Sequence, residues 1–421
     1  MQFLRTLSIL IILITCTLSG CGGGSGGGGG GGTTGPEPLA KPQLTLSISG
    51  CKELLLEWNP IDRADHYRVL HSSDGGPTFT VLSEASNVAT TSTTLELAGH
   101  LTDWGNAKYQ VEACSADETE TTTSDAETLP RTLSIAATGY IKASNTGASD
   151  WFGSTLALNQ NGDTLVVAAE REDSNATTID GDGTNNSADS AGAAYVFVKS
   201  GNSWAQQAYL KASNTDGSDR FGYCADISND GNTVAVGAFL EQSTAQGIDG
   251  NQNDNTGLQV GAVYVFTRAG TTWSQQAYIK ASNADSPDRF ATSLALSGDG
   301  NTLVVGAHGE ASNATGVDGN QNDDSEYYSG AAYVFTRSGT TWSQQAYIKA
   351  SNPDGNDSFG RSIALSNDGN TLAVGTTDEQ SNATGINGDD SNNAADNSGA
   401  VYVYTRSGTT WSHQAYIKAS N

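Results

Sequence analysis

The C-terminal two thirds of the chain repeats itself with a fixed period. Five tyrosines begin a version of the hexapeptide YIKASN, and four phenylalanines precede glycine or alanine with the same step of 69 residues. These residues are Tyr140, Tyr209, Tyr278, Tyr347 and Tyr416, and Phe152, Phe221, Phe290 and Phe359. A period of this size indicates units that cannot bury their apolar faces alone and therefore stack on copies of themselves. We expect the function to belong to the array.

Each unit is expected to contain four short β-strands. In the second unit the predicted strands are 221–227, 233–238, 261–268 and 273–281. Xaa-Gly pairs form the turn between the first and second strands and the turn between the third and fourth. Glycine at these pairs accepts the positive φ that tight hairpin turns require. Four antiparallel strands per repeat are typical of a β-propeller blade. The second strand is almost entirely apolar and should be covered on both faces, whereas the fourth should form the exposed outer edge.

Short motifs connect these units to a known family. Asp219-Arg220-Phe221-Gly222 is followed by Val236-Gly237-Ala238, and the other three units contain counterparts. The motifs resemble the FG-GAP repeat, the blade of integrin-α-like β-propellers, and the likeness is greatest to bacterial surface proteins built from such repeats. In calcium-binding members of that family, the loop between the first two strands contains several Asp and Asn residues. Here that loop is only a tight turn such as Asp230-Gly231, so the calcium site of the family is not expected there.

Carboxylates are instead concentrated in the long loop between the second and third strands. The candidate metal ligands are Asp180, Asp182, Asp249, Asp254, Asp318, Asp323 and Asp389, and Glu172, Glu241, Glu310 and Glu379 just ahead of these loops could add a ligand. Oxygen ligands separated by glycine can wrap a hard cation, and calcium prefers six to eight oxygens. The same residue types also stiffen loops by bonding to their own backbone. Calcium binding and loop stiffening both remain open interpretations.

Charge and the absence of catalytic motifs limit the functions available. The chain has 20 Lys+Arg and 46 Asp+Glu, a net charge of -26, which disfavours nucleic acid and favours cations or basic partners. The five histidines occupy unrelated positions, and no nucleophile elbow, His-Glu-Xaa-Xaa-His motif or phosphate loop is present. We therefore expect no enzymatic activity. A propeller hydrolase or lyase would need a unit whose inner-loop residues break the repeat.

The N-terminus has the features of an export signal. Arg5 precedes an apolar segment, 7–18, that is too short to span a bilayer, and Leu18-Ser19-Gly20-Cys21 follows. This ending resembles a bacterial lipobox, which implies a lipoprotein signal peptide over residues 1–20 and lipidation of Cys21. An ordinary secretory signal is the alternative. Residues 21–38 form a glycine-rich tether that should not fold.

A separate small domain is expected between residues 39 and 130. Leu54, Leu56 and Trp58 alternate on one strand, and Tyr109 and Val111 alternate on a later one. The pattern resembles a fibronectin type III domain, a β-sandwich. Cys51 and Cys114 could form a disulfide in an exported protein. However, the resemblance places them at opposite ends of the sandwich, so we expect no bond between them.

The predicted architecture is all-β: a fibronectin type III-like sandwich followed by four β-propeller blades over residues 139–421. An open arc is expected, because Tyr140–Asn145 is a spare fourth strand while the last unit already has its own at 411–419, and further units are expected after Asn421. The predicted function is binding or adhesion to protein or glycan ligands by a lipoprotein of the bacterial envelope, at the outer membrane or cell surface. The alternatives are a structural envelope protein without a ligand and a propeller hydrolase or lyase.

Overall fold

The computed structural model describes residues 37–50, 52–96, 106–129, 141–200 and 203–420. The predicted signal peptide, Cys21, most of the tether, Cys51 and Tyr140 lie outside these residues. The described segments are almost entirely β-strands and turns, which confirms the all-β fold class. No helix in them is long and apolar enough to cross a membrane.

The N-terminal domain is a sandwich of two antiparallel sheets. One sheet has the order β1-β2-β5 and the other the order β4-β3-β6-β7, with β8 also paired to β6. The strands are β1 (Leu44–Gly50), β2 (Glu53–Trp58), β3 (His66–Ser72), β4 (Thr80–Val81), β5 (Ser92–Glu96), β6 (Lys108–Cys114), β7 (Thr121–Thr123) and β8 (Glu127–Thr128), and a 3-10 turn, η1 (Ser83–Ala85), follows β4. Leu54, Leu56 and Trp58 pack against Tyr109 and Val111 in the core, as their alternation predicted. Alternation places these side chains on the inner faces of the two sheets.

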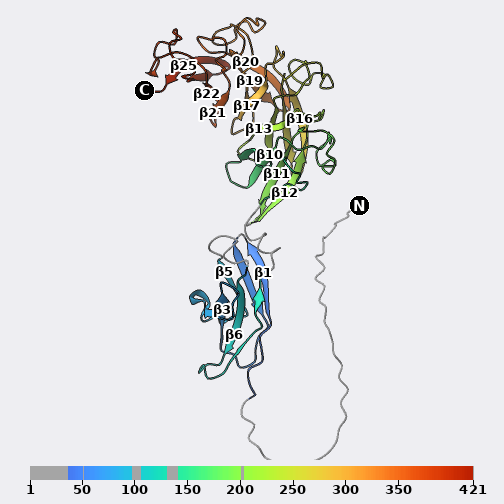
Figure 1. Ribbon diagram of the computed structural model, residues 1–421, viewed down its shortest axis with the longest axis vertical. Helices are drawn as coiled ribbons and strands as arrows, with labels where there is room; N and C mark the ends of the chain where they lie inside the picture. Colours follow the sequence, from blue (N-terminus) through green and yellow to red (C-terminus); the bar gives the residue numbers. More distant parts are fainter. Residues whose placement is uncertain (1–36, 51, 97–105, 130–140, 201–202, 421) are drawn as a thin grey trace, which may run out of the picture.

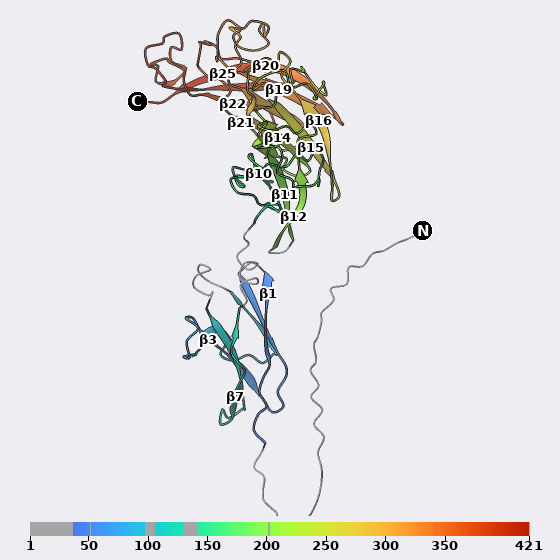
Figure 2. The same ribbon diagram turned by 45° about the vertical axis from the view of Figure 1, so that its right-hand side comes forward.

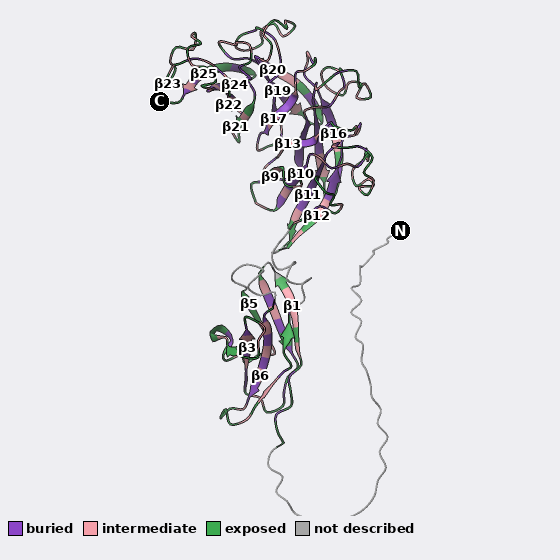
Figure 3. Ribbon diagram, viewed as in Figure 1, coloured by how far each residue is buried: buried purple, intermediate pink, exposed green. Residues whose placement is uncertain are grey.

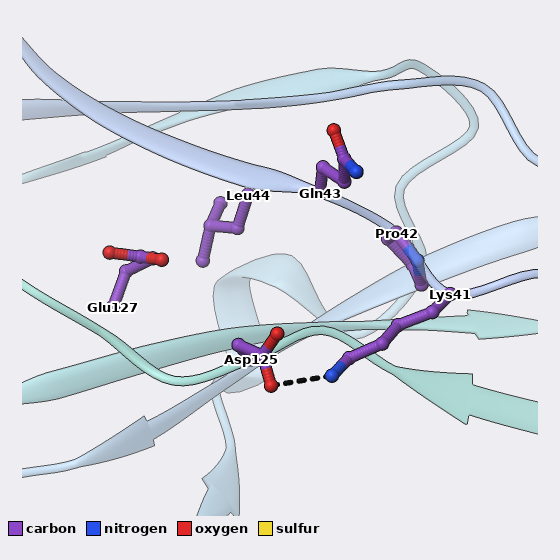
Figure 4. Close-up of a pocket in the computed structure, with 6 residues that line it drawn as sticks. All are labelled: Lys41, Pro42, Gln43, Leu44, Asp125 and Glu127. Atoms are coloured by element: carbon purple, nitrogen blue, oxygen red, sulfur yellow. Dashed lines mark hydrogen bonds and ion pairs between the residues drawn. The ribbon is translucent and has the colours of Figure 1, made fainter. Parts of the chain in front are cut away.

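Two further features of this domain bear on its chemistry. Cys114 is buried and has a free thiol. A cleft of about 310 Å³ lies between the segment before β1 and the segment between β7 and β8. In Figure 4 the ammonium of Lys41 lies against the carboxylate of Asp125 at the edge of this cleft, and both side chains are largely exposed. An exposed ion pair of this kind contributes little to stability.

Four four-stranded antiparallel sheets, which we number 1 to 4, follow in the order of the repeats. Sheet 1 contains β9 (Thr155–Leu158), β10 (Thr164–Ala169), β11 (Ala193–Ser200) and β12 (Ser203–Leu210), and sheet 2 contains β13 (Phe221–Ile227), β14 (Thr233–Ala238), β15 (Ala262–Ala269) and β16 (Thr272–Ile279). Sheet 3 contains β17 (Phe290–Leu296), β18 (Thr302–Ala307), β19 (Ala331–Ser338) and β20 (Thr341–Ile348), and sheet 4 contains β21 (Ser362–Leu365), β22 (Thr371–Thr376), β24 (Ala400–Ser407) and β25 (Thr410–Lys418). A short β23 (Gly385–Ile386) pairs with β25. The first strand forms one edge of each sheet. The fourth strand forms the other edge in sheets 1 to 3, as predicted for propeller blades, whereas in sheet 4 the short β23 lies outside β25.

Consecutive sheets pack face to face. At each interface between two sheets, which we call a joint, small side chains contact large ones. In the first joint, Val196 and Leu210 of sheet 1 pack against Phe221, Tyr264 and Phe266 of sheet 2. The two later joints repeat this arrangement at the equivalent positions. The sheets follow one another along an arc, from sheet 1 to sheet 4 near the C-terminus (Figures 1 and 2).

The arc is open, and this changes the burial of the last sheet. Every residue of β14 and β18 is buried, as predicted for the second strand, whereas β22 alternates between buried and partly exposed residues (Figure 3). The prediction of cover on both faces is therefore wrong for the fourth unit, because no described sheet packs on its far face. At the other end, Leu156 and Leu158 of β9 are 62% and 56% exposed. The first and fourth sheets do not close on each other into a ring.

The segment just before sheet 1 does not form the predicted spare strand. Residues 141–145 have no strand geometry. Even so, the amide of Asn145 donates to Glu172 of sheet 1, as Asn214 does to Glu241 of sheet 2. Ser144 likewise bonds to Gln206, as Ser213 does to Gln275. Ser144 and Asn145 therefore occupy the place that the residues just after a preceding fourth strand take in the later units.

Candidate functional site

The YIKASN motif forms a buried network that joins consecutive sheets. Each repeat buries an ion pair between the motif lysine and a glutamate 39 residues earlier, with Nζ to Oε2 distances of 2.9, 2.6, 2.8 and 2.6 Å. The pairs are Lys211–Glu172, Lys280–Glu241, Lys349–Glu310 and Lys418–Glu379. The motif asparagine then donates to the glutamate of the next sheet, as Asn214 does to Glu241 at 2.9 Å. These glutamates already bind the motif lysine and asparagine, so their suggested role as additional metal ligands is not supported.

The predicted calcium ligands bond to the backbone of their own unit. Asp180, Asp249 and Asp318 each accept the amide N–H of the motif tyrosine at 2.8 to 2.9 Å. The carboxylates of Asp182, Asp254, Asp323 and Asp389 each accept an N–H from the residue two positions later. Hydrogen bonds from Thr244 and Thr256 lower the pKa of Asp254 to about 2. Across the described segments, no three acidic, histidine or cysteine side chains lie close enough together to hold a metal ion.

Calcium binding nevertheless stays a prediction, and melting of the full chain tests it. A cation that binds the folded state and not the unfolded state must raise the melting temperature by mass action. We expect the melting temperature to rise by several degrees between excess chelator and about 5 mM calcium. A ligand at about 100 times its Kd adds about 2.7 kcal/mol to the free energy of unfolding. Magnesium at the same concentration is the control for ionic strength. Equal melting temperatures with chelator and calcium would leave only the loop-stiffening interpretation.

The four units diverge at one edge of the array, where the first strand begins and the second ends. We call this surface the divergent rim. It comprises the residue before each Phe (Trp151, Arg220, Arg289, Ser358), the residue two after it (Ser154, Tyr223, Thr292, Arg361), the residues after the second strand (Glu170 with Arg171, Phe239, His308, Thr377), and the pair ahead of the third strand (Asp189-Ser190, Leu258-Gln259, Tyr327-Tyr328, Asp396-Asn397). Equivalent residues of stacked repeats lie along one edge of the stack. The rim is therefore a row of equivalent positions, some buried and some exposed, whose chemistry changes from unit to unit.

Cations and aromatic rings alternate along the first half of the rim. The guanidinium of Arg171 lies 3.5 Å from the ring centroid of Trp151, which is 50% exposed. Arg220 lies 3.8 Å from the carboxylate of Glu170 and 6.0 Å from the ring of Phe239. Burial raises the pKa of Glu170, while the two guanidinium groups oppose this rise. A guanidinium over an aromatic face gains about 0.5–2 kcal/mol, and more when the pair is desolvated.

A closed ring of hydrogen bonds fixes Arg289 in the second half of the rim. Burial, with the nearby charges of Arg361 and Arg289, lowers the pKa of His308 to about 4, so the imidazole is neutral at neutral pH. Its Nε2 accepts from the guanidinium of Arg289 at 3.3 Å, and its Nδ1–H therefore donates to the Thr292 hydroxyl at 2.7 Å. Thr292 donates in turn to the carbonyl of Arg289 at 2.6 Å. The guanidinium is thereby held 5.3 Å from the ring of Tyr328.

Several rim residues have a left-handed backbone although they are not glycine. The φ angles of Trp151, Arg220, Arg289, Gln259 and Tyr328 lie between 54 and 59°. This conformation costs about 1–2 kcal/mol for a residue with a Cβ. Such strain is concentrated at functional sites, where the surrounding structure holds it in place. The equivalent Ser190, Ser358 and Asn397 share this conformation, so it belongs to the repeat. The changing arginines and aromatic rings at these positions make the rim the strongest candidate for a functional surface in the described chain.

Sequence reasoning missed the rim. The differences between units are mainly conservative in the strands but not at the rim positions. The signal was present, because aligning the four units shows Glu, Phe, His and Thr at the position after the second strand. What the sequence could not show was that these positions meet in space.

Comparison with known proteins gives one informative match. The family model of the FG-GAP repeat matches residues 204–266, 273–335 and 342–404, each running from the fourth strand of one sheet to the third strand of the next. The match confirms three FG-GAP repeats, which cover sheets 2 to 4 as far as β24, whereas sheet 1 is matched only in its fourth strand. No curated protein is significantly similar to it.

Solved structures show only remote similarity. The periplasmic gluconolactonase PpgL of Pseudomonas aeruginosa shares 14% identity over 84% of this chain and 68% of its own, with a TM-score of 0.37. A Ca²⁺-stabilized adhesin that helps an Antarctic bacterium bind ice shares 12% identity over 91% and 98%, with a TM-score of 0.17. These scores are too low to establish a common architecture.

Proposed function

We propose that this chain of FG-GAP repeats is a non-enzymatic binding or adhesion protein of the bacterial cell envelope, and that it contacts its ligand through the divergent rim. One observation supports this most: the buried Lys–Glu pair is the same in all four units, while the rim changes in charge and ring content. A purely structural array has no need of such differences. A recognition surface does, because specificity requires different groups at defined positions.

The composition of the rim supports binding over catalysis. The rim contains Trp151, three tyrosines and four arginines, which are residue types that dominate the energy of protein interfaces, and Leu258 and Tyr327 are 69% and 56% exposed. The one histidine of the rim, His308, is neutral and already bonded at both ring nitrogens. It therefore has no free position from which to act as a general base. A structural protein without a ligand remains the alternative, and it predicts that rim substitutions have no effect on binding.

The N-terminal segments fit a role in display. The strand orders β1-β2-β5 and β4-β3-β6-β7 support the fibronectin type III resemblance, in which the sandwich serves as a spacer. The glycine-rich tether of residues 21–38 would separate this spacer from the membrane, since such a flexible coil spans about 20 Å. Lipid on Cys21 would anchor the whole chain, because two or more acyl chains give stable attachment.

Replacing Cys21 with alanine tests the anchor. The parent is expected in the membrane fraction, and the Cys21→Ala variant should be found almost entirely in the soluble fraction, because the lipidated thiol is lost. Cell fractionation with immunoblotting measures the distribution. Cys16→Ala, which changes a cysteine inside the signal, is the matched control. An ordinary secretory signal would be indicated if Cys21→Ala remained in the membrane pellet as fully as the parent.

Attachment of beads coated with the full chain tests the binding role of the rim. We expect the beads to attach to at least one member of a panel of immobilised proteins and glycans. Changing Trp151→Ser, Leu258→Asn and Tyr327→Ser together should reduce that attachment at least tenfold, because exposed aromatic and apolar contacts are lost. The matched control changes Leu156→Asn, Leu158→Asn and Ile386→Asn, which are equally exposed but lie off the rim. Equal loss in both triple variants, or no attachment by the parent, would contradict the proposal.

A further inference from the structure

We infer that the ligand of the divergent rim is an acidic peptide segment in which carboxylates alternate with apolar side chains. This inference rests on the proposed binding role of the rim and adds the chemical class of the partner. Three observations lead to it: where the cations of the repeats lie, which apolar side chains flank them, and how charge is distributed over the rest of the chain.

The arginines of the repeats divide into two groups. Arg268, Arg337 and Arg406 belong to the scaffold, where each stacks on a tryptophan of its own sheet and donates to a glutamine of the preceding sheet. The other four, Arg171, Arg220, Arg289 and Arg361, all lie on the rim. The motif lysines are buried in ion pairs. In a chain with a net charge of -26, the rim thus holds the arginines of the repeats that the scaffold does not use: Arg361 is exposed, and the other three are partly buried.

Two of these arginines are partly or fully free to bind an anion. Arg361 is exposed and close enough to lower the pKa of His308. Arg289 uses Nε on Gln259 and one terminal nitrogen on His308, which leaves its other terminal nitrogen without a hydrogen bond in the structure. A guanidinium binds a carboxylate with two parallel hydrogen bonds. The rim therefore offers carboxylate sites in its second half.

Apolar side chains flank these sites at equivalent positions of two units. Leu258 directly precedes Gln259, the partner of Arg289, and is 69% exposed. Tyr327 packs edge-on against Tyr328 with centroids 4.3 Å apart, and Tyr328 lies beside Arg289. An exposed apolar residue on each side of a fixed cation suits a chain that carries apolar and acidic groups in turn.

Long-range charge excludes a long polyanion. Nucleic acid carries one negative charge per about 1.7 Å, and the acidic surface of this chain would repel all of it except the phosphates at the rim. The same net charge also opposes an acidic peptide, but a short peptide presents few charges, and these can contact the arginines of the rim. The rim therefore favours a peptide over nucleic acid or a polyuronate.

Fluorescence anisotropy with a labelled peptide tests this. The probe is a ten-residue peptide in which aspartate alternates with leucine and tyrosine, and its comparison peptide has asparagine in place of aspartate. We expect the full chain to bind the acidic peptide at least tenfold more tightly than the neutral one. Arg361→Gln should weaken binding at least fivefold, whereas Lys199→Gln, an exposed cation off the rim, should leave it unchanged. Leu258→Asn should also weaken binding, with Ile386→Asn, an equally exposed residue, as its control.

The outcomes separate this inference from the proposed function. Equal affinity for the acidic and neutral peptides, with Leu258→Asn still weakening both, would overturn the anionic class and leave the rim as a binding surface. An oligogalacturonate that competes more strongly than the acidic peptide would overturn the peptide class. Binding of the acidic peptide that survives both Arg361→Gln and Leu258→Asn would show that the rim is not the site. Thermal melting of each variant confirms that it is folded.

Discussion

Replacing Lys349 with methionine is expected to lower the free energy of unfolding by about 3–5 kcal/mol, the loss typical of breaking a buried ion pair. The ammonium of Lys349 is fully buried and bonds to Glu310 at 2.8 Å and to the Ser329 hydroxyl at 2.7 Å. Burial lowers the pKa of Lys349, and Glu310 opposes that shift. Without the lysine, Glu310 would remain buried with an uncompensated charge. Urea unfolding of the full chain, followed by tryptophan fluorescence, measures the change.

Two further variants isolate the cause. Lys199→Met removes an exposed lysine and should change stability by less than about 0.5 kcal/mol. Lys349→Met combined with Glu310→Leu should recover part of the loss, because an apolar pair can replace a buried ion pair. Recovery will be incomplete, since Glu310 also accepts from Tyr347 and Asn283. A loss below about 1 kcal/mol for Lys349→Met would mean that water reaches the pair.

The strands and their order could be predicted from the sequence because their signals are local. Alternating apolar residues and Xaa-Gly turns placed β13 and β14 within a residue of their observed bounds. The period then implied stacking, because every unit presents the same two faces. Burial of β22 could not be inferred in this way, since it depends on whether another sheet covers its face.

The candidate site could not be predicted because its signals are not local. Glu310 was considered as a metal ligand on residue type and position alone, but its partner Lys349 is 39 residues away in the chain. On the rim, Arg289, His308 and Tyr328 come from three separate segments that meet only after the sheets have formed. Residue type indicates the chemistry that is available, whereas the fold decides which groups are used by the scaffold.

Replacing Gly261 with alanine is expected to cost at least about 3 kcal/mol more than the same change at Gly399, because overpacking against backbone cannot relax easily. Gly261 and Gly399 occupy the same position, ahead of the third strand, in units 2 and 4. Both have positive φ, +88° and +71°, so both lose about 1 kcal/mol from backbone strain on gaining a Cβ. They differ in what faces them. A Cβ on Gly261 would lie 1.9 Å from the carbonyl oxygen of Phe290 in the next sheet, whereas the nearest atoms to one on Gly399 are 3.2 Å away.

The difference in stability between the two variants therefore reports the cost of the clash between sheets, because the cost of backbone strain is about the same in both. The N–H of Phe290 donates to the carbonyl of Val260 at 2.9 Å, so Phe290 cannot move away from Gly261 without breaking that bond. Melting of the full chain should show Gly261→Ala unfolding at least about 6 °C below Gly399→Ala, since 1 kcal/mol shifts the melting temperature of a domain of 150–250 residues by about 2–4 °C. Gly330→Ala should behave like Gly261→Ala, because Phe359 approaches it to 2.1 Å. Equal melting temperatures for Gly261→Ala and Gly399→Ala would contradict the close approach of each Phe-Gly or Phe-Ala segment to the preceding sheet.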